Sequence, residues 1–271
     1  MFSPYYAWAR RQGGGDPFAH CAFNVALYDI AGKRWAMTER GARHLMRSRD
    51  SMTIGPSAMT WNDDTLTVTL DEVTAPWPSH IRGTVRLHPY ALARHVVALD
   101  TAGVHRWQPL APCAQVDVRL THPRLSWSGP GYFDANSGDA PLAEAFSRWH
   151  WSRASVRNGT AVLYDIERRD GGRLALGLRC DRSGNVHEFA PPPVATLPCS
   201  GWRVPRATRA DAGCAPRVLR TLEDSPFYVR SLVASQLEGD PVVAVHESLA
   251  LDRFRAPWVQ MLLPFRMPRR A

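Results

Sequence analysis

Short stretches in which apolar and polar residues alternate recur along most of this chain. Alternation with a period of two is the pattern of a strand with one buried face, and Gly, Pro, Asn and Asp residues typical of turns separate these stretches. The clearest strands that the pattern predicts are residues 66–73, 81–87, 114–120, 160–167, 173–179, 228–237 and 242–251. The pattern therefore indicates an all-β protein.

Turn sequences pair several of these strands. Asn62-Asp63-Asp64 and Asp170-Gly171-Gly172 each lie between two alternating stretches, so both predict hairpins. Residues 20–40 are interpreted as a further hairpin that turns at residues 29–33. Other segments are read as short helices at residues 40–50 and 142–146 and as a last strand at residues 259–265.

The number of strands bears on domain organisation. About a dozen strands are predicted, more than a single barrel of about eight strands requires. Two small barrels or sandwiches in tandem fit the 271 residues better. We expect the boundary between Leu120 and Gly129-Pro130-Gly131, which gives a first domain at residues 1–125 and a second at residues 126–271.

The charge does not indicate a nucleic-acid partner. The chain has a formal net charge of +8, but the arginines are scattered along it and Lys33 is the single lysine. A scattered charge is a weak footprint for phosphate binding, so we expect no nucleic acid. No apolar run reaches the roughly 18 residues that a membrane-spanning helix needs.

Cysteine usage and the N-terminal residues point to the cytoplasm. The five cysteines are odd in number and show no CxxC spacing, so neither a disulfide framework nor a zinc site is indicated. The first residues lack the charged start and apolar run of a signal peptide. We find no nucleotide or metal motif and expect neither a cofactor nor a metal.

The residues with the most chemistry are acids and histidines set among aromatic rings. Gly131-Tyr132-Phe133-Asp134 lies in a Gly-rich stretch ahead of Trp149-His150-Trp151, and His105-Arg106-Trp107 lies upstream. Such a set suits proton-driven chemistry on an apolar molecule, because the proton needs a donor and a carbocation needs electron-rich faces. The other reading is structural: an Asp in a Gly-rich turn is typical of an Asx turn or cap, and His and Trp are typical of packing.

Motifs spread over the chain carry a family resemblance. They are residues 2–8, residues 35–40, His105-x-Trp107, residues 131–136, residues 149–153, residues 222–228 and residues 246–249. In combination the chain resembles the carotenoid 1,2-hydratases of photosynthetic bacteria, also called acyclic carotenoid hydratases or hydroxyneurosporene synthases. That family normally has a Trp-rich strand before the first motif, so one expectation is a first barrel that lacks N-terminal strands.

The resemblance implies a fold, a reaction and partners. The fold would be two lipocalin-like β-barrels in tandem. The reaction would be the hydration of the terminal C1–C2 double bond of neurosporene, lycopene or a related acyclic carotenoid to a 1-hydroxy carotenoid, without cofactor or metal. Because such a substrate lives in a bilayer, we expect a cytoplasmic protein in peripheral contact with the lipid of the inner photosynthetic membrane.

The family's His-x-Trp and Tyr-x-Asp pairs fall on His105, Trp107, Tyr132 and Asp134. By resemblance Asp134 is the proton donor, since burial raises a carboxyl pKa by up to ~3–5 units. Tyr132 would hold that acid or face the cation, and Trp107 would offer its π face. His105 would orient the attacking water or accept its proton.

Two other classes of function stay open at this point. One is a lipocalin-type carotenoid or lipid carrier, in which the acids and rings only line a binding cavity. The other is a non-catalytic remnant with an incomplete first barrel. For residues 256–271, aromatic and aliphatic side chains with flanking arginines fit either a membrane-facing segment or a last strand with a basic tail.

Overall fold

The computed structural model describes residues 2–29 and 32–270. The chain forms two compact units, each assembled from segments that are distant in sequence. Unit 1 comprises Met1–Pro89, Gln115–Gly131 and Gln260–Ala271, and unit 2 comprises Tyr90–Ala114 and Tyr132–Val259. The predicted boundary at residue 125 falls within the middle segment of unit 1, and the division into residues 1–125 and 126–271 stays a prediction.

The predicted all-β class is confirmed. Strands account for 58% of the structure and helices for 12%. The large sheets have an open strand order, and among the described residues no sheet closes into a barrel. The tandem-barrel arrangement therefore stays a prediction.

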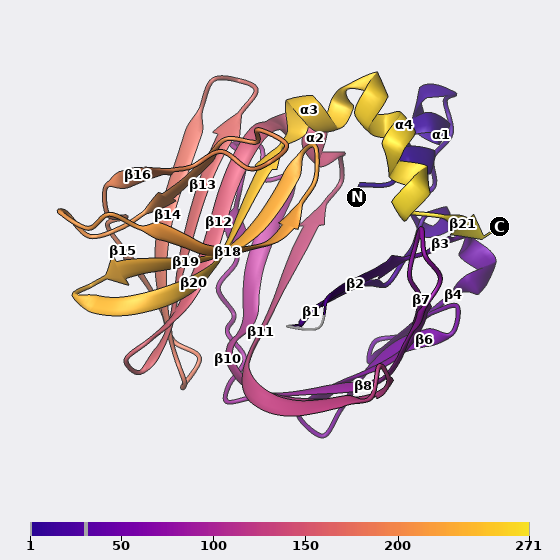
Figure 1. Cartoon of the computed structure of the whole chain (residues 1–271), viewed down its shortest axis with the longest axis horizontal. Helices are drawn as coiled ribbons and strands as arrows, with labels where there is room; N and C mark the ends of the chain where they lie inside the picture. Colours follow the sequence, from indigo (N-terminus) through magenta and orange to yellow (C-terminus); the bar gives the residue numbers. More distant parts are fainter. Residues whose placement is uncertain (1, 30–31, 271) are drawn as a thin grey trace. The chain divides into compact units, whose positions relative to one another are not determined.

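Unit 1 contains antiparallel strands that follow one another along the chain (Figure 1). They are β1 (Asn24–Asp29), β2 (Gly32–Met37), β4 (Leu45–Arg47), β5 (Ser51–Ile54), β6 (Ser57–Asn62), β7 (Thr65–Val73) and β8 (His80–Pro89). The pairs β1–β2 and β6–β7 confirm the predicted hairpins, although residues 30 and 31 of the first turn lie outside the described residues. The predicted helix at residues 40–50 is wrong: a single 3-10 turn, η2 (Ala42–His44), leads directly into β4.

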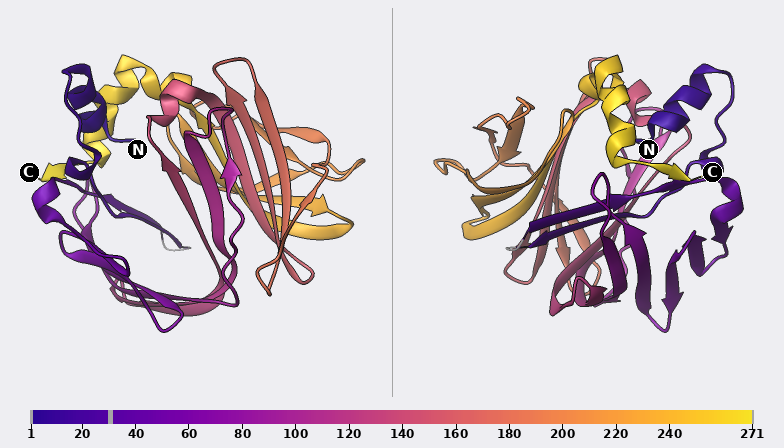
Figure 2. Two further views of the ribbon diagram at one scale, coloured as in Figure 1. Left: turned by 180° about the vertical axis from the view of Figure 1, so that it is seen from behind. Right: turned by 45° about the vertical axis from the view of Figure 1, so that its right-hand side comes forward.

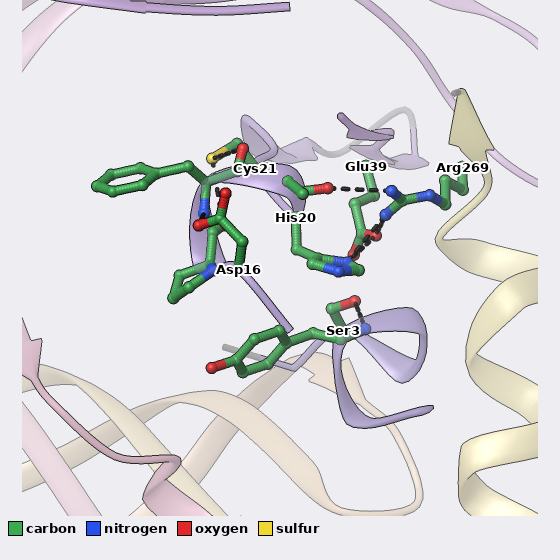
Figure 3. Close-up of polar contacts among 10 residues, drawn as sticks. Ser3, Asp16, His20, Cys21, Glu39 and Arg269 are labelled. Atoms are coloured by element: carbon green, nitrogen blue, oxygen red, sulfur yellow. Dashed lines mark hydrogen bonds and ion pairs between the residues drawn. The ribbon is translucent and has the colours of Figure 1, made fainter. Parts of the chain in front are cut away.

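Polar contacts join the two ends of unit 1 (Figure 3). Ser3 caps α1 (Pro4–Arg11), and the 3-10 turn η1 (Pro17–Ala19) follows. Glu39 of β3 (Glu39–Arg40) is buried and contacts His20 Nδ1 at 2.8 Å. Arg269 of β21 (Arg269–Arg270) also donates to Glu39. Because removing one partner of a buried ion pair leaves an uncompensated charge, this cluster fixes the C-terminal strand beside β3.

Two long strands pass from one unit into the other. They are β10 (His105–His122), which also pairs with β9 (Val97–Ala98), and β11 (Leu125–Gly138). The predicted strand at residues 114–120 lies inside β10. The interpretation of residues 131–139 as a Gly-rich turn is wrong, because the chain continues as strand to Gly138.

Unit 2 is built on a seven-stranded antiparallel sheet of order β15-β14-β13-β12-β20-β19-β18. The strands are β12 (Phe146–Val156), β13 (Gly159–Arg168), β14 (Arg173–Asp181), β15 (Val186–Phe189), β18 (Arg217–Asp224), β19 (Tyr228–Leu237) and β20 (Asp240–Ala250). The predicted strands in this region and the short helix α2 (Leu142–Ala145) are confirmed. Part of the core gathers Ala154, Leu163, Leu237 and Val242 from the central strands.

A separate hairpin packs on one face of this sheet (Figures 1 and 2). It consists of β16 (Val194–Leu197) and β17 (Arg206–Arg209), and β17 contacts β12 and β20. Arg209 donates to both carboxylate oxygens of Asp165 on β13, at 2.7–2.9 Å. Asp165 is thus an acid paired with an arginine of the hairpin.

The C-terminal segment is helical, and the strand predicted at residues 259–265 is wrong. After β20 the chain forms α3 (Leu251–Arg255) and α4 (Pro257–Arg266). The large apolar residues of α4 repeat at positions i, i+3, i+4 and i+7, the spacing of one helix face. They are Trp258, Met261, Leu262 and Phe265. In the described part of the chain, no helix has both the length and the apolar character needed to cross a bilayer.

Candidate active site

Asp134 is held by two hydrogen bonds that end on the same oxygen. Trp107 on β10 donates its indole N–H to Asp134 Oδ2 at 2.8 Å, and Tyr132 donates its hydroxyl to that oxygen at 3.0 Å. Tyr132 and Asp134 are two residues apart on β11, so both lie on one face of the strand. Within the described residues Oδ1 takes part in no hydrogen bond. The carboxyl is fixed in place while one oxygen stays available.

A cavity of about 340 Å³ lies over this carboxyl and is lined by residues of unit 2. Its aromatic wall comes from Trp107, Tyr132, Trp149, Trp151 and Tyr164. Tyr164 meets Trp107 and Trp149 edge to face, with ring centroids 5.5 and 6.2 Å apart. These contacts lock the rings around the acid. The wall offers electron-rich faces to any positive charge that forms inside.

Burial sets the protonation of the groups in the cavity. Desolvation raises the pKa of Asp134, and the negative charge of Glu247 adds to the rise. The hydrogen bonds from Trp107 and Tyr132 and the charge of Arg153 oppose it without reversing it. Burial also raises the pKa of Tyr132 well above its usual value, so this phenol stays a neutral donor. The carboxyl is shifted toward the protonated form that a proton donor requires.

The polar wall of the cavity holds a second carboxyl. Glu247 on β20 pairs with Arg230 on β19, whose Nε and Nη2 lie 2.8 and 2.7 Å from Oε1. Arg153 lies over the Tyr132 ring, 5.1 Å from its centroid. Asn136 completes the polar wall. None of Glu247, Arg230 and Arg153 was predicted as a site residue.

His105 is buried next to the site but is not part of the cavity lining. Its Nδ1 lies 2.6 Å from Asp100 Oδ2, and its Nε2 lies 2.9 Å from the carbonyl of Ala140. A Cβ at Gly138 would come within 2.8 Å of the His105 ring, so β11 approaches this histidine closely at its end. The structure therefore brings together Trp107, Tyr132 and Asp134, and gives His105 partners elsewhere.

Two histidines lie on the face of the unit 2 sheet that is opposite the cavity. His150 on β12 and His246 on β20 stack with ring centroids 6.1 Å apart. Burial lowers the pKa of His150 to about 3 and that of His246 to about 4. His150 Nδ1 lies 2.8 Å from Ser248 Oγ, and His246 Nε2 donates to the carbonyl of Ala207 at 2.7 Å. Alternation along β12 places His150 on the face opposite Trp149 and Trp151, and of these three residues only the tryptophans line the cavity.

Comparison with known proteins identifies the family. The family model described as carotenoid hydratase CrtC matches residues 1–271. This chain belongs to the carotenoid hydratase family. An acyclic carotenoid 1,2-hydratase of Thiocapsa roseopersicina is 53% identical over 99% of this chain and 67% of its own length. The protein of that name from Rubrivivax gelatinosus is 48% identical over 100% of this chain and 68% of its own.

A solved structure agrees with the fold. A protein described as AttH from Nitrosomonas europaea superposes with a TM-score of 0.58 over 84% of this chain and 80% of its own, at 15% identity. At that identity the likeness concerns the fold alone.

The family resemblance drawn from the motifs is confirmed by the family match.

In this member of the carotenoid hydratase family, two motifs distant in sequence meet at one carboxyl. The His-x-Trp motif supplies Trp107 and the Tyr-x-Asp motif supplies Tyr132 and Asp134. The sequence signal that could have drawn attention to Glu247 is the alternation along residues 242–251, which places Val245 and Glu247 on one face. Within the described residues no three His, Cys, Asp or Glu side chains gather as a metal site.

Proposed function

We propose that this chain is a cofactor-independent hydro-lyase that adds water across the terminal C1–C2 double bond of acyclic carotenoids, such as neurosporene and lycopene. The family match and the relatives named acyclic carotenoid 1,2-hydratase support the reaction. They do not favour the alternative of a carrier without catalysis. The observation that carries the mechanism is the Asp134 carboxyl, held by one oxygen inside an aromatic cavity.

The first step transfers a proton from Asp134 to carbon. The π electrons of the C1–C2 bond take the proton from Oδ1, so a C2–H bond forms and a tertiary cation remains at C1. Trp107 and Tyr132 already donate to Oδ2, and hydrogen bonds to a carboxylate are stronger than those to a neutral acid. Both donors therefore stabilise the charge that appears on Asp134 as the proton leaves.

The second step captures the cation with water. The aromatic wall stabilises the cation until water attacks, and a desolvated cation–π contact contributes about 2 kcal/mol. The C1–O bond forms, and loss of a proton from the bound water gives the tertiary alcohol. A cavity of about 340 Å³ is at the small end of ligand sites, so it suits one end of a long polyene.

For His105 the predicted role in orienting water or accepting its proton stays a prediction. Both ring nitrogens have partners outside the cavity lining, at Asp100 and Ala140, and the ring lies against the end of β11. These contacts suit a positioning role for the strand that carries Asp134. A His105→Phe variant with wild-type turnover would rule out any direct part in proton transfer.

We include contact with membrane lipid in the proposal, with helix α4 as the contacting element. Trp258, Met261, Leu262 and Phe265 are 41–70% exposed along one face of this helix. Arg253 lies over the Trp258 ring, 5.9 Å from its centroid, so a cation accompanies the apolar face. Aromatic and aliphatic side chains with nearby arginines favour an anionic interface. This supports peripheral association with the inner photosynthetic membrane, where the substrate would be found.

The membrane proposal has a direct test. Met261→Ser/Phe265→Ser should lower co-sedimentation with vesicles of phosphatidylglycerol and phosphatidylcholine, while turnover of detergent-dispersed lycopene stays near wild type. Unchanged sedimentation would remove α4 from the proposal.

Two lipocalin-like barrels are the finer fold that we propose, because such an architecture suits a long apolar ligand.

The reaction itself is tested by an isotope assay. The purified chain is incubated with lycopene in H₂¹⁸O without added cofactor or metal, and the products are read by mass. Labelled 1-hydroxylycopene would support hydration with water as the oxygen source. A folded chain that binds lycopene but forms no product would favour the carrier, and Asp134→Asn separates the two because a carrier would keep its affinity and a hydratase would lose turnover only.

A further inference from the structure

The cavity contains a carboxyl that the two steps above leave unused. Glu247 on β20 lines the cavity together with Asp134. Its cross-strand neighbour on β19 is Arg230, and its neighbour on β12 is Trp151. The Glu247 side chain is 20% exposed and Arg230 is 32% exposed, so both reach the rim of the cavity. The second step still needs a group to take the proton from water.

The two carboxyls are held in the same way. Arg230 donates from Nε to Oε1 of Glu247 at 2.8 Å, and its Nη2 lies 2.7 Å from the same oxygen as an ion pair. Within the described residues Oε2 accepts no hydrogen bond, just as Asp134 Oδ1 accepts none. A guanidinium whose two nitrogens meet one oxygen orients the carboxylate. Glu247 is therefore paired with a cation through one oxygen, whereas burial shifts Asp134 toward its protonated form.

The other groups that line the cavity are poor proton acceptors. Burial raises the pKa of both Tyr132 and Tyr164, so these phenols stay protonated and serve as donors. Arg153 and Arg230 are cations, and an amide or an indole is not basic at neutral pH. Apart from Asp134, Glu247 is the residue of the described cavity lining with the chemistry of a base.

We propose that Glu247 is the general base of the hydration, which rests on the function proposed above. As water attacks C1, the new C1–O bond forms and the O–H bond breaks, with its proton passing to Glu247 Oε2. Asp134 is then a carboxylate and Glu247 a neutral acid. Transfer of one proton from Glu247 to Asp134 across the cavity restores both, so water and the alkene are the only reactants consumed.

The experiment separates the two proton transfers. Lycopene is incubated in D₂O with the wild type and with Glu247→Gln, and both the hydroxylated product and the deuterium content of recovered lycopene are measured. If Glu247 acts after the cation forms, the variant should make 10²- to 10⁴-fold less product, roughly the contribution of a general base. It should still exchange deuterium into lycopene: Asp134 delivers a deuteron to C2, the uncaptured cation lives long enough for its end to turn about the C2–C3 single bond, and the Asp134 carboxylate then removes the original C2 hydrogen and restores the alkene.

Matched variants guard against a purely structural effect. Glu167→Gln makes the same chemical change at an arginine-paired glutamate of β13 outside the cavity, and should leave both readouts unchanged. Glu247→Asp keeps a carboxylate one methylene shorter and should recover part of the product. Retained lycopene binding by Glu247→Gln shows that the cavity is intact.

Each outcome bears on a different claim. Exchange without product in Glu247→Gln supports the base. Wild-type product formation by Glu247→Gln overturns the base and leaves the hydration standing. If Glu247→Gln binds lycopene but gives neither product nor exchange, Glu247 is needed for the protonation step. That result also overturns its role as the general base. If the wild type itself gives neither product nor exchange, the proposed function fails and the base fails with it.

Discussion

Both faces of the β12–β20 strand pair carry titratable groups, but the groups on the two faces differ in the chemistry that they can perform. On one face Trp149, Trp151 and Glu247 line the cavity over Asp134. On the other face His150 and His246 stack beside the β16–β17 hairpin. Burial favours the neutral form on both faces, since it penalises charge of either sign. A neutral carboxyl is a proton donor, whereas a neutral histidine in this setting is only a packed ring.

What separates the faces is how many oxygens of each carboxyl are bonded. On the face that packs against the hairpin, Arg209 donates from two nitrogens to both oxygens of Asp165. On the cavity face Asp134 and Glu247 are each bonded through one oxygen. A carboxylate bonded at both oxygens is held in place, whereas a carboxyl bonded at one oxygen beside a cavity keeps the other available for chemistry.

Asp134→Asn should abolish most of the turnover, with a loss of roughly 10²- to 10⁴-fold or more, because an amide cannot supply an acidic proton. Lycopene binding should persist, measured by absorbance titration beside the H₂¹⁸O assay. Asp165→Asn removes the arginine-paired acid of the other face and should lower stability while turnover per folded molecule is kept. Comparable loss of turnover in the two variants would break the contrast.

The hairpin face should make the protein acid-sensitive. The folded-state pKa values of about 3 and about 4 lie below the ordinary value of 6.5, so the unfolded chain binds more protons between pH 6.5 and 4. The free energy of unfolding should fall as pH drops through this window, on the order of 3 kcal/mol per histidine at about 1.4 kcal/mol per pKa unit. Urea unfolding at several pH values measures it. His150→Asn/His246→Gln should flatten the curve, and an equally steep curve would refute the assignment.

Trp107→Phe should keep an aromatic ring and remove one hydrogen bond to Asp134. A hydrogen bond to a charged group contributes about 1.5–3 kcal/mol, so kcat should fall by roughly 10- to 100-fold. Trp149→Phe is the matched control, because Trp149 lines the same cavity and its ring contacts Tyr164 rather than Asp134. Equal losses in the two variants would mean that the indole of Trp107 acts only by packing.

The smallest effect concerns the pH at which Asp134 loses its proton. Glu247 raises the pKa of Asp134 and Arg153 lowers it. Deuterium exchange needs protonated Asp134, so its loss at high pH should move to lower pH in Glu247→Gln and to higher pH in Arg153→Gln. Exchange followed across pH checks both. Shifts in the same direction would show that these charges do not act on Asp134.

Local sequence patterns predicted much of this fold. Residues 228–237 were predicted as a strand from alternation, and β19 has these bounds. Helix α4 was read as a strand because residues 259–265 are apolar, although the spacing of Trp258, Met261 and Phe265 fits a helix face. A short apolar run does not by itself separate a strand from a helix.

The sequence also predicted only part of the candidate site. Tyr132 and Asp134 share a face of β11, although the glycines around them led to the wrong interpretation of a turn, and the family motifs linked both residues to Trp107. Glu247 was missed because alternation tells which residues share a face and not what that face meets. Its place in the cavity depends on its register with Arg230 and Trp151, which are set by pairing between distant strands.

The two hydrogen bonds that hold Asp134 through a single oxygen have a stereochemical consequence. With Oδ2 fixed by Trp107 and Tyr132, the carboxyl cannot turn over to present its other oxygen, so the proton always approaches the alkene from one side. The alcohol has two methyl groups on C1 and is not chiral there. Formed in heavy water, it should nevertheless carry its isotope at a single prochiral position of C2, and the handedness of that labelled carbon would record the orientation in which the polyene lay.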